Sequence, residues 1–286
     1  MKNTVVTIGN FDGLHIGHLK LINRVLREAG KHKMSSLVCS FNTNTKEYSE
    51  LLFPQNQLKE YISELGIDKY KKLNFLRDVK GLSCEEFIEK YIINEYNAKY
   101  VVVGEDFYFG KNKSGNAEAL AELGKKYGFK TIILKLLKKG EATVSSTYIR
   151  GLIKDGKTER ANALMYEPLS VYGIVKKGYN IGGKELSYPT ANISVPKNTV
   201  PIKHGVYKTK TVIDGILYDS ITNVGYAPTK KKSSPTIETH IFSLSGDIYK
   251  KRIKVIFCKY IRNERKFKSI EALKAQIKKD IIKAKG

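Results

Sequence analysis

Cysteine is scarce in this sequence, and long apolar runs are absent from it. The three cysteines (Cys39, Cys84 and Cys258) lie far apart and are odd in number. They favour neither a disulfide framework nor a zinc site. No stretch reaches the roughly 18 apolar residues that a membrane-spanning helix needs, and the first residues have the pattern of a strand, not of a signal peptide. We therefore expect a cytoplasmic protein that does not enter a membrane.

Acidic side chains are also few. The sequence has 28 Asp and Glu against 51 Lys and Arg, which gives a formal net charge of +23. Such a charge favours polyanionic partners, including nucleic acid, but also ATP and phosphorylated products. The basic residues are spread along the chain, and only eight are arginine, whose planar fork reads bases. We expect no specific nucleic-acid partner; a basic RNA-associated protein on an enzyme scaffold is the alternative from another functional class.

The two halves of the 286-residue chain have different patterns. In the first, apolar strand-like runs alternate with amphipathic segments, which is typical of a mostly parallel sheet covered on both faces. In the second, strands follow one another with turn residues between most of them, which is typical of an antiparallel barrel or sandwich, and one helix comes last. The expected strands are 4–8, 37–41, 100–104, 131–137, 169–175, 206–213, 216–222, 236–244 and 253–261, and the expected helices are 19–29, 57–65, 83–92, 117–127 and 269–281.

The stretch "GNFDGLHIGH" (Gly9–His18) joins the first expected strand to the first expected helix. A glycine-rich turn there places backbone N–H groups and a helix N-terminus at the carboxyl edge of the sheet, where phosphates bind. Gly13 and Gly17 allow close approach of the backbone, and His15 and His18 could both point toward one ligand. Two imidazole N–H donors suit a reaction in which negative charge grows on a phosphate and on departing pyrophosphate. The alternative is that these are ordinary surface histidines in a turn, which could also lie three residues apart.

A second run of hydrogen-bonding residues, "VSSTYIR" (144–150), lies near the end of the first half. Ser145, Ser146 and Thr147 supply hydroxyls and free N–H groups at a helix start, and Arg150 adds a cation one turn later. Taken alone, the run is explained by ordinary N-capping. In one domain with the histidine pair, it favours a phosphate site.

The first stretch resembles the His-x-Gly-His signature of the nucleotidyltransferase superfamily, and the longer string is similar to the adenylyltransferase half of the bacterial bifunctional riboflavin kinase/FAD synthetases. "VVVGEDFYFGKNKSGN" (101–116) and "VSSTYIR" resemble two further elements of that half. The resemblance implies that His15, His18 and Arg150 stabilise the transferring phosphate and the leaving pyrophosphate, and that Phe109 contacts the flavin. The nucleotide contacts that it implies are Gly9, Asn10, Phe11, Asp12, Gly17, Asp106 (or its neighbour Glu105), Ser145, Ser146 and Thr147.

One stretch departs from the family. After the second strand the family usually carries a Phe-x-Pro-His-Pro-like turn near the flavin site, whereas this chain has "SFNTNTKEY" (40–48). The polar replacement would remodel the flavin pocket or remove the activity of this half. A riboflavin kinase with an inactive or altered adenylyltransferase half is therefore the alternative within the family.

In the second half, "SYPTANI" (187–193) places Thr190 and Asn192 at alternate positions of an extended segment, so both face the same way. Two such oxygen-bearing side chains can hold Mg²⁺ against ATP phosphates, although a segment of this composition is usually only a turn. In "TIETHIF" (236–242), Glu238 faces opposite to Ile237 and Thr239. A lone glutamate in a strand is normally a solvated surface residue.

These stretches resemble the riboflavin kinase signature Pro-Thr-Ala-Asn and the motifs that follow it, in the family's order. The resemblance implies that Glu238 accepts the proton of the riboflavin 5′-hydroxyl during attack on the γ-phosphate of ATP. It also places Thr190 and Asn192 on ATP and Mg²⁺, Gly182 on ATP, and Arg262 and Glu264 near the flavin. Ser187 replaces a family glycine, a change that could stiffen the phosphate loop.

We therefore predict two domains, 1–166 and 167–286. The first is a Rossmann-like α/β nucleotidyltransferase, and the second is an antiparallel β-barrel followed by a C-terminal helix. The predicted function is phosphorylation of riboflavin to FMN and adenylylation of FMN to FAD. ATP, riboflavin, FMN and Mg²⁺ are the expected ligands, and a monomer or weak oligomer is the expected state.

Overall fold

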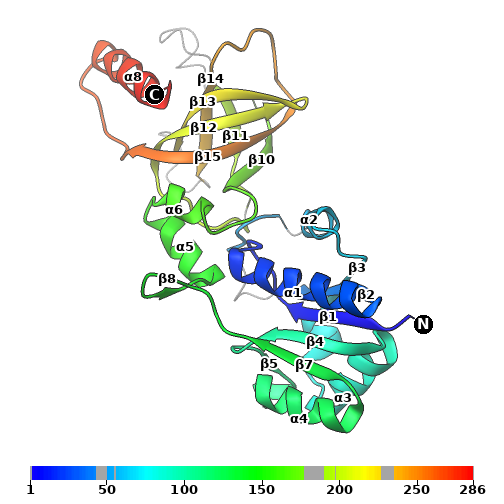
Figure 1. Cartoon of the computed structure of the whole chain (residues 1–286). Helices are drawn as coiled ribbons and strands as arrows, with labels where there is room; N and C mark the ends of the chain where they lie inside the picture. The colour runs from blue at the N-terminus through cyan, green and yellow to red at the C-terminus, as the bar shows by residue number, and fades with distance from the viewer. Residues whose placement is uncertain are drawn as a thin grey trace. The chain divides into compact units, whose positions relative to one another are not determined.

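The computed structural model describes residues 2–42, 50–54, 56–176, 190–196, 198–226 and 235–285. It consists of two compact units (Figure 1). The first comprises residues 1–48 and 54–148, and the second comprises residues 49–53 and 149–286. In the ranges that the structure describes, no helix is both long and apolar enough to cross a membrane.

The first unit is built on a five-stranded parallel sheet with the strand order β3-β2-β1-β4-β7. The chain leaves β1 toward β2 on one side and later continues from β4 to β7 on the other, so the loop after β1 lies where the direction of winding changes. In sheets of this kind, ligands bind at that point, beyond the carboxyl ends of the strands. The strands are β1 (Thr4–Gly9), β2 (Ser35–Asn42), β3 (Lys69–Asn74), β4 (Ala98–Gly104) and β7 (Lys130–Leu134).

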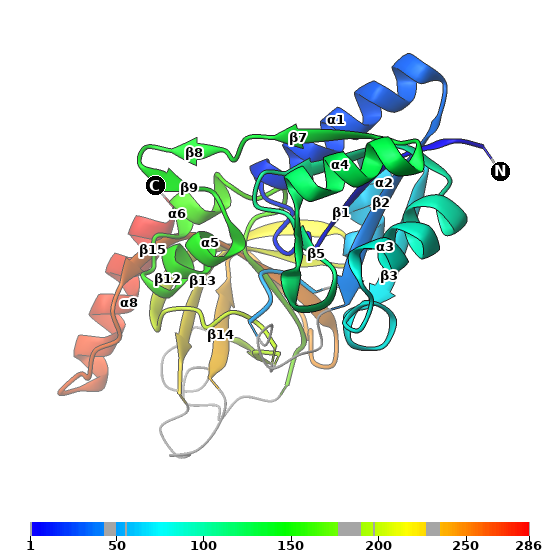
Figure 2. The same ribbon diagram turned by 90° about the horizontal axis from the view of Figure 1, so that it is seen from below.

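Helices cover both faces of this sheet (Figures 1 and 2). One face packs against the helices that follow β3 and β4, through a core that includes Phe87, Ile88 and Leu120. The opposite face is covered by the helix after β1, as right-handed crossovers in opposite directions require. The helical segments are α1 (Ile16–His32), α2 (Leu58–Glu64), η2 (Phe75–Val79), α3 (Cys84–Phe87), η3 (Ile88–Glu95), η4 (Lys111–Lys113) and α4 (Ala117–Tyr127), and short hairpins pair β5 (Tyr108–Phe109) with β6 (Gly115–Asn116) and β8 (Lys138–Lys139) with β9 (Ala142–Thr143).

The predicted α/β architecture is confirmed, and one strand of the five-stranded sheet, β3, was missed. The capping box of Ser83 and Glu86 is present at the start of α3, with both reciprocal hydrogen bonds. Strand β3 gave no strand signal because it is an edge strand, in which Leu73 is the only buried residue among polar neighbours. Periodicity detects a strand only when one face is buried along its length.

The second unit is a six-stranded antiparallel sheet with the order β10-β15-β12-β13-β14-β11. It curls into a nearly closed barrel, since Lys176, directly after β10, donates its N–H to the carbonyl oxygen of Asn192 in β11 at 2.9 Å. Gly173 permits this approach, because a Cβ there would lie 2.7 Å from Ile193 Cβ. The strands are β10 (Ser170–Ile174), β11 (Ala191–Ser194), β12 (Gly205–Ile213), β13 (Ile216–Gly225), β14 (Thr236–Ile241) and β15 (Arg252–Arg262), and the helices are α5 (Ser146–Lys154), α6 (Thr158–Asn162) and α8 (Ile270–Lys285).

The barrel interior contains a chain of buried hydroxyl groups. Successive members, joined by hydrogen bonds of 2.8 to 2.9 Å, are Thr211, Ser220, Thr209, Thr222 and Thr239. All are at most 1% exposed. A hydroxyl donates once and accepts twice, so the chain satisfies groups that would otherwise be costly to bury.

We predict that Thr222→Val lowers the free energy of unfolding by about 1–3 kcal/mol, because it removes a partner from both Thr209 and Thr239. Thr211→Val is the matched control: its one partner, Ser220, keeps the bond to Thr209. Urea unfolding followed by circular dichroism measures both. Equal losses for the two variants would contradict the role given to the central hydroxyl.

Candidate active sites

The loop between β1 and α1 adopts backbone angles that are rare outside glycine. Phe11 and Leu14 have positive φ angles of 51° and 37°, and Gly13 between them has 78°. Such a conformation costs a non-glycine residue on the order of 1 kcal/mol. Burial offsets this cost, because the side chains of Phe11 and Leu14 are 0% exposed. These two side chains anchor the loop in the interior of the unit, and the nucleotide contact of Phe11 stays a prediction.

The two predicted catalytic histidines lie together at the start of α1. His15 is the N-cap residue, and its Nδ1 accepts a hydrogen bond from the backbone N–H of His18 at 3.4 Å. The imidazoles stack with centroids 3.6 Å apart and an angle of 17° between their planes. A Cβ on Gly17 would lie 3.0 Å from the ring of His15. Gly17, which was predicted to contact the nucleotide, therefore leaves space for the imidazole of His15.

Burial keeps both imidazoles neutral. It lowers the pKa of His15 to about 4 and lowers the pKa of His18 well below its ordinary value, where the proximity of His15 adds to the effect. Because Nδ1 of His15 accepts a hydrogen bond, the proton of the neutral ring is on Nε2. Nδ1 of His18 is buried and has no hydrogen-bond partner within the described part of the chain. The pair can therefore donate N–H bonds to an oxyanion without carrying charge beforehand.

The second predicted phosphate-binding run contacts the first. Ser145 Oγ accepts a hydrogen bond from the backbone N–H of Tyr148 at 3.2 Å, as an N-capping residue does. Ser146 Oγ donates to the carbonyl oxygen of Asp12 at 2.8 Å, across 134 residues of sequence. The hydroxyl of Ser146 therefore holds the loop in place, whereas Thr147 is exposed at the first turn of α5.

Arg150 lies in the second compact unit, where its Nε donates to the carbonyl oxygen of Glu50 at 2.7 Å. Lys154, one turn further along α5, forms an ion pair with the Glu50 carboxylate at 2.6 Å. The role of Arg150 at the phosphates stays a prediction.

The remaining predicted residues of the first unit follow β4. Glu105 Oε1 accepts a hydrogen bond from the backbone N–H of Leu136 at 2.7 Å, so this carboxylate fixes the segment after β7. Asp106 is exposed and carries its carboxylate against Gly104, which favours it over Glu105 as the nucleotide contact. Phe109 is 6% exposed and packs in the core. A flavin contact by Phe109 stays a prediction, because its ring is enclosed here.

In the second unit, the predicted base Glu238 lies in a row of polar residues across neighbouring strands. Asn192 of β11 pairs with Glu238 of β14, which pairs on its other side with Asn223 of β13. Cross-strand partners project from the same face of a sheet. The alternation predicted for β14 is confirmed, since Ile237 and Thr239 are fully buried while Glu238 is half-buried.

The side-chain oxygens of Thr190 and Asn192 suit a magnesium ion. Asn192 Nδ2 donates to the carbonyl oxygen and to Oγ1 of Thr190, at 3.2 and 3.4 Å. This pairing turns the amide nitrogen away and leaves Oδ1, an oxygen ligand of the kind that Mg²⁺ prefers. Among the described residues, no group of three or more His, Cys, Asp and Glu could hold a metal ion.

The pKa of Glu238 is raised, chiefly by burial and further by the negative charge of Glu264. A carboxylate with a raised pKa accepts a proton more readily once it is ionised.

The two residues predicted near the flavin make contacts with the protein. The guanidinium of Arg262 forms a bidentate ion pair with Asp280 of α8, with its shortest N–O distance at 2.7 Å, and Asp280 is 2% exposed. Glu264 accepts a hydrogen bond from Asn223 Nδ2 at 3.2 Å. Through its ion pair with Asp280, Arg262 connects β15 to the C-terminal helix. The flavin contacts of Arg262 and Glu264 stay predictions.

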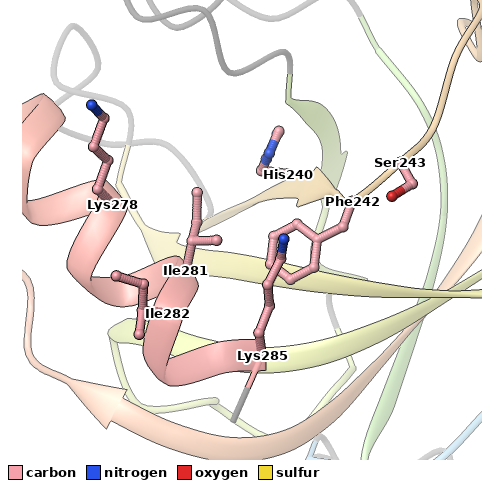
Figure 3. Close-up of a pocket in the computed structure, with 7 residues that line it drawn as sticks. All are labelled: His240, Phe242, Ser243, Lys278, Ile281, Ile282 and Lys285. Carbon is pink, nitrogen blue, oxygen red and sulfur yellow. The ribbon is translucent and has the colours of Figure 1, made fainter.

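A groove lies between the end of β14 and α8 (Figure 3). Its apolar part is formed by Phe242, Ile281 and Ile282, and Lys285 Nζ lies 5.3 Å from the centre of the Phe242 ring. His240 stands between this part and Glu238 along the strand. The lining residues are His240, Phe242, Ser243, Lys278, Ile281, Ile282 and Lys285.

Asn223 and Asp280 were not identified from the sequence. Asn223 gave no signal, because its importance comes from strand register. Asp280 could have been found, since it falls on the apolar helical stripe of Leu273, Ile277 and Ala284, where a carboxylate needs a buried partner. The ATP contact of Gly182, the effect of Ser187 and the replaced turn at 43–48 lie outside the described residues.

Two family models match the chain, FAD synthetase over residues 1–148 and riboflavin kinase over residues 165–286. Bifunctional riboflavin kinase/FMN adenylyltransferases are similar over nearly the whole length: that of Buchnera aphidicola from Schizaphis graminum is 37% identical (98% of this chain, 92% of the relative), and that of Bacillus subtilis is 33% identical (97% and 90%). A crystal structure described as a macrolide-efflux protein from Streptococcus pneumoniae superimposes with a TM-score of 0.90 at 29% identity, over 100% of this chain and 94% of the other.

Proposed function

The chain belongs to the family of bifunctional riboflavin kinase/FMN adenylyltransferases, and we propose that its two activities use separate sites, one in each domain. It phosphorylates riboflavin to FMN and converts FMN to FAD, with ATP as the donor in both reactions. We assign the second reaction to residues 1–166 and the first to residues 167–286. The observation that carries this assignment is that each half has its own polar constellation, the stacked imidazoles after β1 and the Asn192–Glu238–Asn223 row. A cytoplasmic location and a monomeric or weakly oligomeric state are part of the same proposal.

In the adenylyltransferase domain, an oxygen of the FMN phosphate attacks the α-phosphorus of ATP, and the bond from that phosphorus to the leaving pyrophosphate breaks. The attacking phosphate is already anionic at neutral pH, so no general base is needed. The neutral imidazoles of His15 and His18 donate N–H bonds to oxygens whose negative charge increases in the transition state. Being buried and fixed by the N-cap geometry, they need no reorganisation as the reaction proceeds.

We expect His18→Ala to reduce the rate of FAD formation from supplied FMN by about 10²–10³-fold, the usual cost of one oxyanion donor. Riboflavin phosphorylation should be unchanged, because the kinase site is separate. Chromatography of flavins after incubation with ATP and Mg²⁺ measures both products. His32→Gln, at the far end of α1, is the control. No FAD from the wild-type protein would favour the alternative of a kinase with a silent first domain.

In the kinase domain, Glu238 takes the proton of the riboflavin 5′-hydroxyl as that oxygen attacks the γ-phosphorus of ATP and ADP leaves. When bound, Mg²⁺ neutralises charge on the phosphates, and the oxygens of Thr190 and Asn192 would hold it. Asn192 is the cross-strand neighbour of Glu238, so the metal-binding and proton-accepting groups are side by side.

We expect Glu238→Gln to abolish FMN formation while FAD synthesis from supplied FMN continues. In the wild-type kinase, activity should fall on acidification at a higher pH than for a glutamate with an ordinary pKa of about 4.3, because burial and Glu264 raise the pKa of Glu238. The pH profile of kcat/KM for riboflavin tests this. Full kinase activity in the folded Gln variant would remove Glu238 from the role of base.

We propose that the groove between β14 and α8 takes the isoalloxazine ring. Glu238 and His240 lie on one side of β14, and Phe242, the first residue after the strand, lines the groove together with His240, so Glu238 and Phe242 are at most about 13 Å apart along the chain. The ribityl chain would occupy this interval, past His240, and place the 5′-hydroxyl at Glu238. Phe242 and Ile281 would then contact the ring (Figure 3).

Phe242→Ala should raise the KM for riboflavin at least about tenfold, as expected when an aromatic contact worth more than 1.4 kcal/mol is lost. The KM for ATP should stay the same. Ile216→Ala, an exposed apolar residue at the far end of β13, is the control. An unchanged riboflavin KM in a folded variant would exclude this groove as the ring site.

A further inference from the structure

The C-terminal helix is joined to the barrel by a buried ion pair. Asp280 of α8 is 2% exposed, and Nε and Nη2 of Arg262, at the end of β15, donate to its carboxylate at 2.7 to 3.1 Å. We propose that Asp280 is a positioning residue for riboflavin: through Arg262 it fixes α8, and α8 forms one wall of the groove in Figure 3. This inference rests on the proposed function of the groove as the site of the isoalloxazine ring.

Apolar packing alone holds α8 weakly against the barrel. Of the 16 helix residues that the structure describes, only Asp280 and Ala284 are buried. Ala284 and the half-buried Ile281 pack in a small cluster with Val206 and Ile221. A helix that buries so little apolar surface gains little from any one placement, because the hydrophobic contribution is proportional to the area removed from water. Its exact placement therefore depends on another interaction.

The ion pair supplies the direction that this packing lacks. A guanidinium that binds through two nitrogens matches a carboxylate in one planar orientation. Gln276, one turn earlier in α8, donates to Asp280 Oδ1 at 2.7 Å and accepts a hydrogen bond from Arg265. The guanidiniums of Arg262 and Arg265 lie 5.9 and 4.7 Å from the centre of the Phe267 ring. Two residues of the helix are thus tied to two arginines at and beyond the end of β15, which fixes the rotation of α8 and its position along its axis.

Stability alone does not require a carboxylate at this position. Position 280 falls on the helical stripe of Leu273, Ile277 and Ala284, where an apolar side chain would also pack. Replacing a buried ion pair by apolar residues of similar volume is often neutral or stabilising. An ion pair instead selects one arrangement of the groups that it joins. We therefore assign Asp280 to the placement of α8.

The residues of α8 that line the groove all lie within five positions of Asp280, and Ile281 follows it directly. A helix rises about 1.5 Å and turns about 100° per residue, so the orientation of Asp280 determines that of Ile281. Phe242 lies on the other wall, after β14 (Figure 3). A flat ring between two walls needs a fixed spacing, because a gap of about 0.5–1 Å already loses about a quarter to a half of a dispersion contact. The ion pair would set this spacing.

The test is steady-state riboflavin phosphorylation by the full-length Asp280→Asn variant. Asparagine keeps one oxygen for Arg262 and removes the charge. We expect the KM for riboflavin to rise about three- to tenfold, because the α8 wall is no longer fixed. The kcat and the KM for ATP should stay the same, since Glu238 lies on β14. Glu167→Gln is the matched control: it removes the ion pair of Glu167 with Lys254, which also belongs to β15, and should leave the riboflavin KM unchanged.

A double variant separates placement of the groove wall from a general loss of stability. When Asp280 acts through the wall that faces Phe242, the two effects overlap, because the spacing matters little once the facing ring is gone. Adding Asp280→Asn to Phe242→Ala should therefore raise the riboflavin KM by less than about twofold more. Gln276→Leu removes one hydrogen bond from Asp280 and keeps the ion pair, so it should raise the KM by a smaller factor than Asp280→Asn.

The outcomes are distinguishable. An unchanged riboflavin KM in the folded Asp280→Asn variant overturns the inference, and so does a rise that multiplies fully with that of Phe242→Ala. If Asp280→Asn does not fold, Gln276→Leu decides, and a wild-type KM in that variant rejects the role of Asp280. Phe242→Ala is measured in parallel. A wild-type KM there means that the groove is not the ring site and the proposed function fails, whereas a raised KM there with an unchanged one in Asp280→Asn rejects only the role of Asp280.

Discussion

The alternation of faces along β14 is the constraint on which the kinase half depends. Along this strand, each polar residue that points away from the barrel is followed by a residue whose side chain packs inside the barrel. Ile237 and Thr239 are fully buried, and Thr239 ends the interior chain of hydroxyl groups. A shift of register by one residue would bury Glu238 and expose the hydroxyl chain, at a cost to both faces at once. The position of the carboxylate that we propose as the base is therefore determined by the packing on the opposite face of the strand.

In the adenylyltransferase half, the positions of the predicted catalytic residues are fixed in a different way. Its two predicted catalytic histidines lie at the N-cap and in the first turn of α1, so no strand register fixes them. Instead, Phe11 and Leu14 are buried in strained conformations, and the imidazoles of His15 and His18 stack on each other. In a chain of net charge +23, the two histidines that we propose to meet the phosphates are kept neutral by burial. In this proposal, bulk charge attracts ATP to the protein, while short, oriented N–H donors act on the reacting phosphate.

Sequence reasoning identified what is encoded locally. The period-two pattern of β14, the capping box of α3 and the glycine-rich stretch before α1 all rest on neighbours within a few residues, and each is present. It missed β3, whose buried surface is a single leucine, and it missed pairings set by tertiary structure. The bond from Ser146 to Asp12, the ion pair of Arg262 with Asp280 and the contact of Asn223 with Glu264 join residues that are 18 to 134 positions apart. No local pattern encodes such a partner, and the ligand contacts that the resemblance implies for Ser146 and Arg262 stay predictions.

The bond between Ser146 and Asp12 also bears on the order in which the protein is made. The loop after β1 leaves the ribosome early, but the hydroxyl that holds its carbonyl belongs to a residue synthesised 134 positions later. Until α5 has emerged, the strained turn at Phe11 and Leu14 lacks this restraint. The loop therefore reaches its complete set of contacts late in the synthesis of the first half, after all the strands of its sheet have been made.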